Sequence, residues 1–356
     1  MLTTVSLTGC VPAPSSPAFA WDELPAVPDN TGFAGSFAGV SNNALLVAGG
    51  ANFPDGGAPW TGSAKMWYDK IFVLETPQGP WKEAGKLPRP LGYGVSLSWR
   101  GGLVCLGGSN ADGHFADAFI LRYGQGRIQV EALPAMPKPN ANACGVLLGD
   151  VVYVAGGLEK PDATTTESLF WALNLARPAA ERKWEVLPSW PGPSRMLPVA
   201  GAQAGAFYLF SGTRLKEGKR EYLQDAYTYV PGAGWSAIAD VPQAMVAAPS
   251  PTYAAGSSLF LFGGDDGKYA ETAASLKENH PGFSRNIWQY DTATNAWTQA
   301  GEIFTRIGKE AASDPNGSVW APVTTPLVTW NGQVVLPGGE VRPATRSPRV
   351  LIARPQ

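Results

Sequence analysis

The stretch Leu45-Leu46-Val47-Ala48-Gly49-Gly50, a short apolar run that ends in two glycines, decides the fold of this chain because it recurs. Five more copies end at the pairs Gly107-Gly108, Gly156-Gly157, Ser211-Gly212, Gly263-Gly264 and Gly338-Gly339. The first residues of successive pairs are 58, 49, 55, 52 and 75 positions apart. Six copies of one unit of about 50 residues predict a repeat architecture rather than several unrelated domains.

Each unit shows the same order of strand signals. An apolar strand leads through a tight turn, such as Asn42-Asn43 or Asn331-Gly332, into the strand that ends in the glycine pair. A third strand follows, and a fourth begins near a tryptophan and usually ends at a Leu-Pro or Val-Pro step. The tryptophans are Trp81, Trp184, Trp235 and Trp297, with Ile128 in the second unit. Four strands per unit are typical of a kelch-type β-propeller blade, so we expect an all-β, six-bladed propeller.

The two ends of the chain complete one blade. After Gly339 only residues Arg349 to Ala353 remain as a strand, whereas Trp21-Asp22-Glu23-Leu24-Pro25 has the tryptophan and Leu-Pro step of a fourth strand. Joining these segments closes the ring and removes exposed sheet edges. We therefore expect one propeller domain over residues 21–356, in which the N-terminal strand completes the last blade, behind a tether over residues 1–20.

Residues 1–20 carry a separate signal. Leu7-Thr8-Gly9-Cys10 resembles the lipobox of bacterial lipoproteins, whose cysteine is acylated, and residues 11–20 have the Pro/Ser/Ala composition of a tether. Only nine residues precede Cys10 and none is Lys or Arg, which departs from a complete signal peptide. The motif predicts a lipidated Cys10, a membrane tether and a periplasmic or outer-membrane location. The alternative is a disordered tail with a chance cysteine.

Composition excludes several classes of function. The 356 residues have a formal net charge of −2 and no basic run, so nothing indicates nucleic-acid binding. Two histidines exclude most His-built metal sites, and we expect His114 and His280 to be solvated loop residues. The sequence has no nucleotide-binding, hydrolase or zinc motif, and Cys105 and Cys144 read as buried strand residues. No metal or cofactor is predicted, and the oligomeric state stays open.

Long insertions follow three of the strands. They cover residues 51–69, 265–285 and 304–320, and residues 271–278 of the second insertion have a short helical pattern. Long loops on rigid blades commonly carry function.

The loop after the sixth glycine pair has an unusual composition. Residues Glu340, Arg342 and Arg346 place one carboxylate and two guanidiniums within seven residues. Gly338-Gly339 precedes this stretch, and Pro343 lies within it. A carboxylate can accept a proton, and arginine can bind a substrate carboxylate through two hydrogen bonds. The alternative is a solvated loop with an ion pair.

At these residues the chain resembles the bacterial N-acetylneuraminate epimerases (sialic acid mutarotases), which are six-bladed kelch propellers. Gly339-Glu340-x-x-Pro343-x-x-Arg346 is similar to a family stretch whose glutamate is the proposed proton acceptor. Residues 37–50 and 93–117 are similar to family segments that usually lie near the C-terminus. The chain thus resembles a cyclically permuted branch. It departs from the family at Leu91, Ser109 and Pro348, where Arg, Glu and an acid are usual.

The resemblance implies an isomerase that interconverts the α and β anomers of N-acetylneuraminic acid by acid/base ring opening, without a cofactor. We expect Glu340 and Arg346 to be catalytic, with Glu340 as the base and Arg346 holding the sugar carboxylate. Arg342, Arg195 and Tyr93 are predicted substrate-binding residues. Two alternatives stay open: a non-catalytic propeller that binds protein or glycan, and a mutarotase or isomerase for another acidic sugar.

Overall fold

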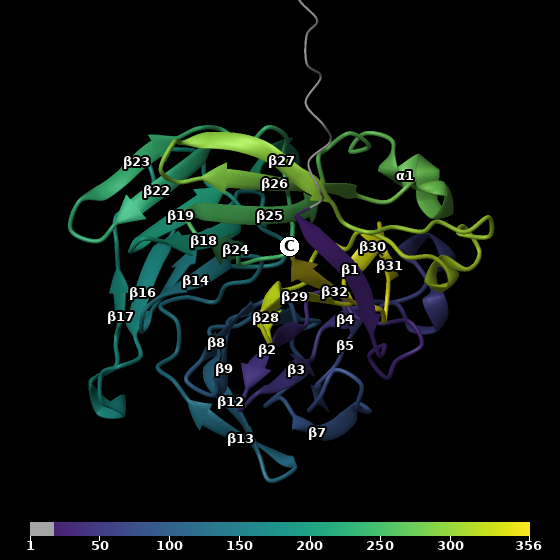
Figure 1. The fold of residues 1–356 in the computed structure, drawn as a ribbon, viewed down its shortest axis with the longest axis horizontal. Coiled ribbons are helices and arrows are strands. Elements are labelled where there is room, and N and C mark those ends of the chain that lie inside the picture. Colours follow the sequence, from purple (N-terminus) through teal and green to yellow (C-terminus); the bar gives the residue numbers. More distant parts are fainter. Residues whose placement is uncertain (1–17) are drawn as a thin grey trace, which may run out of the picture.

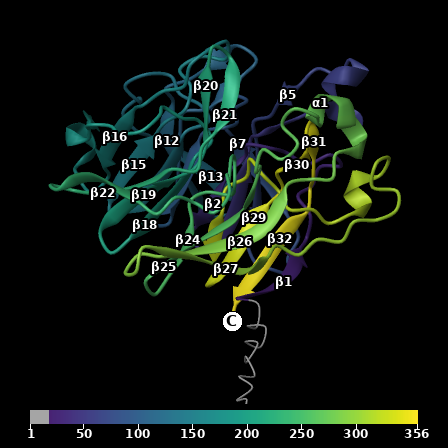
Figure 2. The ribbon, with the colours of Figure 1, turned by 90° about the horizontal axis from the view of Figure 1, so that it is seen from above.

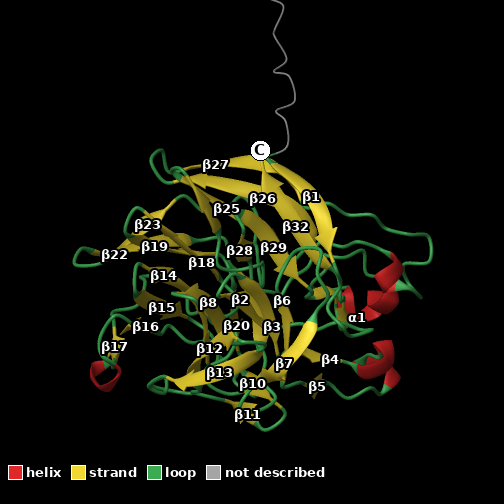
Figure 3. Cartoon of the chain, turned by 60° about the horizontal axis from the view of Figure 1, so that its bottom comes forward, coloured by secondary structure: helices red, strands yellow, loops and turns green. Residues whose placement is uncertain are grey.

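Six four-stranded antiparallel sheets stand around a common axis in the computed structural model, which describes residues 18–356 (Figure 1). The six-bladed β-propeller predicted from the repeats is confirmed. Strands dominate these residues, and the helical turns are short and peripheral (Figure 3).

The blades are numbered in chain order, and the innermost strand of each is given first. Blade 1 consists of β2 (Phe37–Ser41), β3 (Ala44–Ala48), β6 (Lys70–Leu74) and β7 (Lys82–Lys86). Blade 2 consists of β8 (Val95–Trp99), β9 (Gly102–Leu106), β12 (Ala118–Gly124) and β13 (Arg127–Ala132). Blade 3 consists of β14 (Cys144–Leu148), β15 (Val151–Ala155), β16 (Phe170–Asn174) and β17 (Trp184–Val186).

The other three blades repeat this plan. Blade 4 consists of β18 (Val199–Gln203), β19 (Ala206–Phe210), β22 (Ala226–Val230) and β23 (Gly234–Ile238). Blade 5 consists of β24 (Tyr253–Ala255), β25 (Ser258–Gly264), β26 (Ser284–Asp291) and β27 (Ala296–Glu302). Blade 6 consists of β28 (Val328–Trp330), β29 (Gln333–Pro337), β32 (Val350–Pro355) and β1 (Phe19–Leu24).

Additional hairpins follow the glycine pairs of four blades. They are β4 (Ala51–Asn52) with β5 (Met66–Trp67), β10 (Ser109–Asn110) with β11 (Gly113–His114), β20 (Thr213–Lys216) with β21 (Lys219–Tyr222), and β30 (Glu340–Arg342) with β31 (Thr345–Arg346). The helical turns are η1 (Pro54–Gly56), η2 (Pro59–Thr61), η3 (Ala179–Glu181), α1 (Ala273–Leu276), η4 (Lys277–Asn279) and η5 (Pro315–Gly317). Figure 2 shows β20, β21, β5, β31 and α1 on the face opposite the C-terminus.

The turns between the first two strands explain the hairpins locally. Asn42 and Asn43 have φ values of 45° and 67°, and Asn331 and Gly332 have values of 51° and 73°. Two successive positive φ values define the primed turn that matches the twist of paired strands, and Asn and Gly adopt them at low cost.

The predicted ring closure is confirmed. β1 pairs antiparallel with β32, from Phe19 opposite Pro355 to Leu24 opposite Val350. The strand begins at Phe19, two residues before the predicted domain boundary at Trp21. Phe19 is 4% exposed, and its ring packs edge-on against Phe260 and Phe262 of blade 5. The N-terminal strand therefore pairs within blade 6 and also packs against the preceding blade.

The hydrophobic core is divided into layers between neighbouring blades. The cluster around Val104 and Trp171 joins blades 2 and 3, and the cluster around Leu45 and Trp330 joins blades 1 and 6. Four further large clusters occupy the other four interfaces. Burial of apolar side chains between blades therefore stabilises the ring as a whole.

A tryptophan recurs at the same position in most blades, and the contacts between blades explain why. Five indole N–H groups donate to a backbone carbonyl of the preceding blade at N···O distances of 2.7–3.0 Å. The donor–acceptor pairs are Trp81–Pro25, Trp184–Pro134, Trp235–Pro188, Trp297–Ala239 and Trp21–Glu302. Three acceptors are the prolines of Leu-Pro steps, so both sequence signals belong to one contact between blades.

Six backbone hydrogen bonds form a second connection, around the axis. One residue of each blade donates its N–H to the carbonyl of the equivalent residue in the preceding blade, at 2.7–2.9 Å. The six residues are Gly35, Tyr93, Asn142, Leu197, Ala247 and Thr324. Each has a positive φ of 50–67°. Gly35 donates to Thr324, so the series closes into a circle, which we call the axial ring.

We predict that Phe19→Ala lowers the free energy of unfolding by about 3–5 kcal/mol, because it leaves a cavity between blades 5 and 6. Chemical denaturation measures this change. Val186→Ala is the matched control, since Val186 is 72% exposed, and it should change stability little. Equal stability of the Phe19 variant and the parent protein would contradict closure by β1.

Candidate functional site

A cavity of about 1110 Å³ lies on the face that carries the hairpins. Loops and hairpins from all six blades line it, including residues from the first insertion and from the second. A volume of this size is at the upper end of the range for small-molecule sites. Lining side chains from every blade mean that a bound molecule would contact residues far apart in the sequence.

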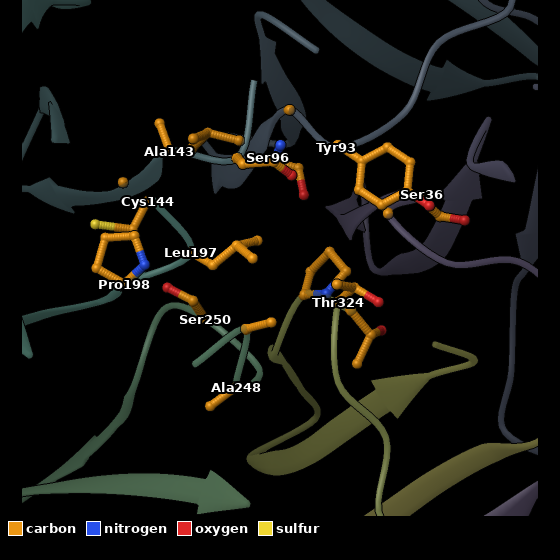
Figure 4. Close-up of a pocket in the computed structure, with 18 residues that line it drawn as sticks. Ser36, Tyr93, Ser96, Ala143, Cys144, Leu197, Pro198, Ala248, Ser250 and Thr324 are labelled. Carbon is orange, nitrogen blue, oxygen red and sulfur yellow. The ribbon is translucent and has the colours of Figure 1, made fainter. Parts of the chain in front are cut away.

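The axial ring forms the floor of this cavity. Five of its members line both the large cavity and a narrow cavity of about 80 Å³ on the axis below it, namely Tyr93, Asn142, Leu197, Ala247 and Thr324. Figure 4 shows Tyr93, Cys144, Leu197, Ser250 and Thr324 around the narrow cavity. The ring thus separates a wide chamber from a narrow axial space.

Glu340 lies at the start of β30, directly after the sixth glycine pair. Its backbone bridges to Val323, the residue that precedes the axial-ring member Thr324. Gly339 has a φ of 109°, and a Cβ atom there would lie 2.7 Å from the Val323 carbonyl oxygen. Only glycine permits this close approach. The glycine pair therefore brings Glu340 to the cavity floor.

The Glu340 carboxylate is held through one oxygen. Oε1 accepts hydrogen bonds from Nη1 of Arg346 at 3.1 Å and from the Ala344 N–H at 2.8 Å. Among residues 18–356, no hydrogen-bond donor contacts Oε2. The side chain is 20% exposed and lines the cavity. One oxygen is thus fixed, and the other is available to a ligand.

Arg346 connects the carboxylate to Tyr93. Its guanidinium is 4% exposed, Nη2 donates to the Tyr93 hydroxyl at 3.4 Å, and the Phe53 ring centroid lies 5.1 Å from the guanidinium carbon. Nε is buried without a partner among the described residues. Burial alone lowers the pKa of Arg346. The neighbouring Glu340 and Tyr93 raise the pKa by more, so it lies above its ordinary value and the guanidinium stays charged. The structure brings Glu340, Arg346 and Tyr93 together at one site, whereas their predicted roles stay predictions.

Arg342 does not reach the cavity. Its side chain is 3% exposed, and Nη1 donates to the carbonyls of Glu278 and Ala311 at 2.5 and 2.8 Å. These carbonyls belong to the second and third insertions. The prediction that Arg342 holds substrate disagrees with this geometry, because its guanidinium anchors two loops to β30.

Arg195 is also away from the site. It is completely buried, and it donates to the Ser211 carbonyl at 2.8 Å and to Oδ2 of Asp225 at 2.6 Å, both in blade 4. Its own backbone bonds to Gly157 and Glu167 of blade 3. A structural contact therefore stands where a substrate contact was predicted, since the guanidinium binds blade 4 while the backbone of the same residue binds blade 3.

Blade 5 holds an acid that is equivalent to Glu340 and was not predicted from the sequence. Asp265 follows the fifth glycine pair, bridges to Val246 as Glu340 bridges to Val323, and lines the same cavity. Its Oδ2 accepts a hydrogen bond from the Tyr222 hydroxyl at 2.7 Å. Burial and this carboxylate raise the pKa of Tyr222, so the phenol stays protonated. Alignment of the glycine pairs would have revealed Asp265.

Both histidines line the cavity, contrary to the expectation of solvated loops. His280 is 4% exposed, and its Nδ1 accepts the Gly282 N–H at 3.2 Å, which leaves the proton of the neutral ring on Nε2. Burial lowers the pKa of His280, so this imidazole is neutral at pH 7. The half-buried His114 contacts the Leu158 carbonyl through Nδ1 at 3.0 Å.

The three cysteines differ in what the structure shows of them. Cys105 and Cys144 are buried free thiols, as predicted, and burial raises the pKa of both. Cys10 lies outside the described residues.

Within residues 18–356, no group of three or more His, Cys, Asp or Glu residues is arranged to hold a metal ion, and no helix is long and apolar enough to cross a membrane.

We predict that Arg195→Met destabilises the protein by about 3 kcal/mol, because the Asp225 carboxylate and the backbone carbonyls of Pro193, Ser211 and Asp225 lose a donor. Chemical denaturation measures the change. Arg127→Met removes the same charge from the exposed surface of β13 and should change stability little. If both variants unfold like the parent protein, Arg195 does not join blades 3 and 4.

Comparison with known proteins gives partial matches. The family model for N-acetylneuraminate epimerase matches residues 15–130. N-acetylneuraminate epimerase 1 of Escherichia coli O6:H1 (strain CFT073) is 37% identical over 118 residues, which are 31% of this chain and 32% of that protein. The Yersinia enterocolitica N-acetylneuraminate epimerase is 39% identical over 109 residues, 28% of this chain and 27% of that protein. The Salmonella enteritidis PT4 protein of the same name is 42% identical over 90 residues, 23% of each chain.

The chain thus spans about a third or less of the length of the curated relatives that it matches. The matched segment contains blades 1 and 2 with Tyr93, and it ends before Glu340 and Arg346. Over residues 15–130 the predicted resemblance is confirmed: this part of the chain matches the N-acetylneuraminate epimerase family.

Proposed function

We propose that this protein is a mutarotase that interconverts the α and β anomers of N-acetylneuraminic acid. The observation that carries the proposal is the Glu340–Arg346 pair on the floor of the large cavity, with Oε2 of Glu340 free to accept a proton. The match of residues 15–130 to N-acetylneuraminate epimerases supports the choice of substrate.

Ring opening moves one proton away from the sugar and another to it. As the bond between the anomeric carbon and the ring oxygen breaks, the anomeric hydroxyl loses its proton and becomes a ketone oxygen. The ring oxygen gains a proton and becomes a hydroxyl. Rotation about the adjacent carbon–carbon bond and closure by the reverse steps give the other anomer. The site must therefore provide one proton acceptor and one proton donor near the ring.

Glu340 is placed to accept the proton. Because Arg346 and the Ala344 N–H both bind Oε1, they fix the orientation of the carboxylate. Oε2 can then approach the anomeric hydroxyl. Among residues 18–356, the buried Nε–H of Arg346 has no partner, so it can donate to an oxygen of the sugar acid.

The lining of the cavity suits a sugar, which carries polar hydroxyls around a ring with apolar faces. Trp60, Trp67, Tyr269 and Phe283 line them, together with the proton-bearing Tyr222 hydroxyl. Such a mixture of aromatic surface with a few placed polar groups is typical of small-molecule sites. Of the positions that depart from the family, Ser109 lines the cavity, whereas Leu91 is fully buried in the core. Ser109 is therefore the departure that bears most directly on sugar specificity.

We predict that Glu340→Gln slows enzymatic anomerisation by about 100-fold or more, the usual contribution of a positioned proton acceptor. NMR measures α-to-β conversion of N-acetylneuraminic acid immediately after sialidase release. Glu185→Gln in β17 is the matched control, because Glu185 is exposed and distant from the site, and it should convert like the parent protein. A Glu340→Gln protein as fast as the parent protein would disprove the base assignment.

The same assay separates the alternatives. Acceleration only with a different acidic sugar would identify a mutarotase or isomerase of another specificity. A parent protein that binds glycan or protein but accelerates no anomerisation would be a non-catalytic kelch propeller.

We also propose that Cys10 is lipidated and tethers the propeller to a periplasmic or outer-membrane surface, where sugars arrive from outside the cell. The lipobox-like Leu7–Cys10 and the tether composition of residues 11–20 support this location. We expect the protein, expressed with its complete native N-terminus, to fractionate with membranes and to carry a lipid mass on Cys10. Cys10→Ala should release it. A soluble parent protein without added mass would refute the anchor.

A further inference from the structure

Lys65 is a positively charged residue that lines the large cavity and was not predicted as a site residue. It lies in the first insertion, one residue before β5, and is half-buried. Its ammonium nitrogen is 4.0 Å from the ring centroid of Tyr93 and 5.0 Å from that of Trp67. A cation over aromatic faces is attracted by the ring electrons while its N–H groups stay free to donate. Two rings therefore place the Lys65 ammonium inside the cavity.

The charge of Lys65 is not neutralised by the protein. Within residues 18–356, no carboxylate lies within ion-pair distance of its ammonium, and no oxygen accepts a hydrogen bond from it. The guanidinium of Arg346, by contrast, is already paired with Glu340. A partly desolvated ammonium without an anion is costly unless a ligand supplies the opposite charge.

Tyr93 links this free cation to the proposed catalytic pair. The Lys65 ammonium lies over the face of the Tyr93 ring, and the hydroxyl of the same ring accepts a hydrogen bond from Arg346. Tyr93 is also a member of the axial ring, so its position is fixed by the fold. One anchored tyrosine thus places Lys65 beside Arg346 and Glu340.

The other unpaired cations of the cavity are less suited to select a ligand. Lys219 and Arg220 lie on β21 and are exposed to solvent, where water screens their charge. Lys65 is shielded by Tyr93 and Trp67 and lies next to the reacting groups. Compared with the exposed Lys219 and Arg220, it has the environment in which a charge contributes more to binding.

We propose that Lys65 binds the carboxylate of the substrate and makes the site selective for acidic over neutral sugars. The choice of sugar rests on the proposed function, but the selectivity for a carboxylate follows from the free ammonium. A carboxylate bound by Lys65 leaves Arg346 engaged with Glu340, so the base keeps its orientation during the reaction. Lys65 is a binding and specificity residue, and it takes no part in proton transfer.

The experiment compares an acid with its neutral ester. Dissociation constants of N-acetylneuraminic acid and of its methyl ester are measured by ligand-observed NMR with the parent protein, Lys65→Met and Lys65→Arg. We expect Lys65→Met to weaken binding of the acid about 10- to 100-fold, the effect of one charge-assisted hydrogen bond. The ester should lose less than about threefold, and Lys65→Arg should restore most of the affinity for the acid.

Controls separate this inference from a general effect of charge or folding. Lys216→Met removes the same charge from an exposed position on β20 that does not line the cavity, and it should bind both ligands like the parent protein. In the anomerisation assay, Lys65→Met should raise KM while kcat stays within about threefold of the parent value.

The outcomes distinguish the two proposals. Equal loss of acid and ester in Lys65→Met, unchanged affinity for the acid, or a parent protein that prefers neither ligand would overturn the role of Lys65. A parent protein that accelerates no anomerisation but prefers the acid through Lys65 would refute the mutarotase and uphold the carboxylate site. A parent protein that accelerates anomerisation, with KM and affinity for the acid unchanged in Lys65→Met, would do the reverse.

Discussion

Six backbone hydrogen bonds around the axis are the constraint on which the rest of the structure depends. Each axial-ring residue adopts a left-handed backbone conformation, which costs a non-glycine residue about 1–2 kcal/mol. The cost is offset because every N–H and carbonyl of the circle finds a partner. The ring sets the spacing of the blades at the axis, and the tryptophan–carbonyl bonds and apolar layers set it farther out.

The same constraint creates the site. In each blade the residue before the axial-ring member bridges to the residue after the glycine pair, so six equivalent positions meet near the cavity floor. In blades 1 and 4 these positions hold Ala51 and Thr213, whereas blades 5 and 6 hold Asp265 and Glu340. A symmetric scaffold thus carries an asymmetric chemistry, because repeats fix where a side chain lies and leave its type free.

Three buried arginines differ in their hydrogen-bond partners, and these partners separate structural from functional roles in this propeller. Arg195 and Arg342 give all their strong hydrogen bonds to carbonyls and a carboxylate between loops or blades, where an unpaired charge would be costly. Arg346 is equally buried, yet it reaches Glu340 and Tyr93 at the cavity. Residue type alone therefore does not distinguish a binding arginine from one that holds the fold together.

The local pattern of the chain predicts the six blades, the closing strand and the nearness of Glu340 to Arg346. Apolar periodicity, turn residues and a seven-residue hairpin are properties of short segments. Proximity of Lys65, Asp265 and His280 to that pair could not be predicted in the same way. These residues come from insertions whose paths depend on contacts between blades, such as Trp60 with Glu278 and Arg342 with Ala311. Long-range packing, which no short segment encodes, determines which charged side chains are buried in structural hydrogen bonds, such as Arg195 and Arg342. It also determines which charged side chains, such as Lys65, face the cavity.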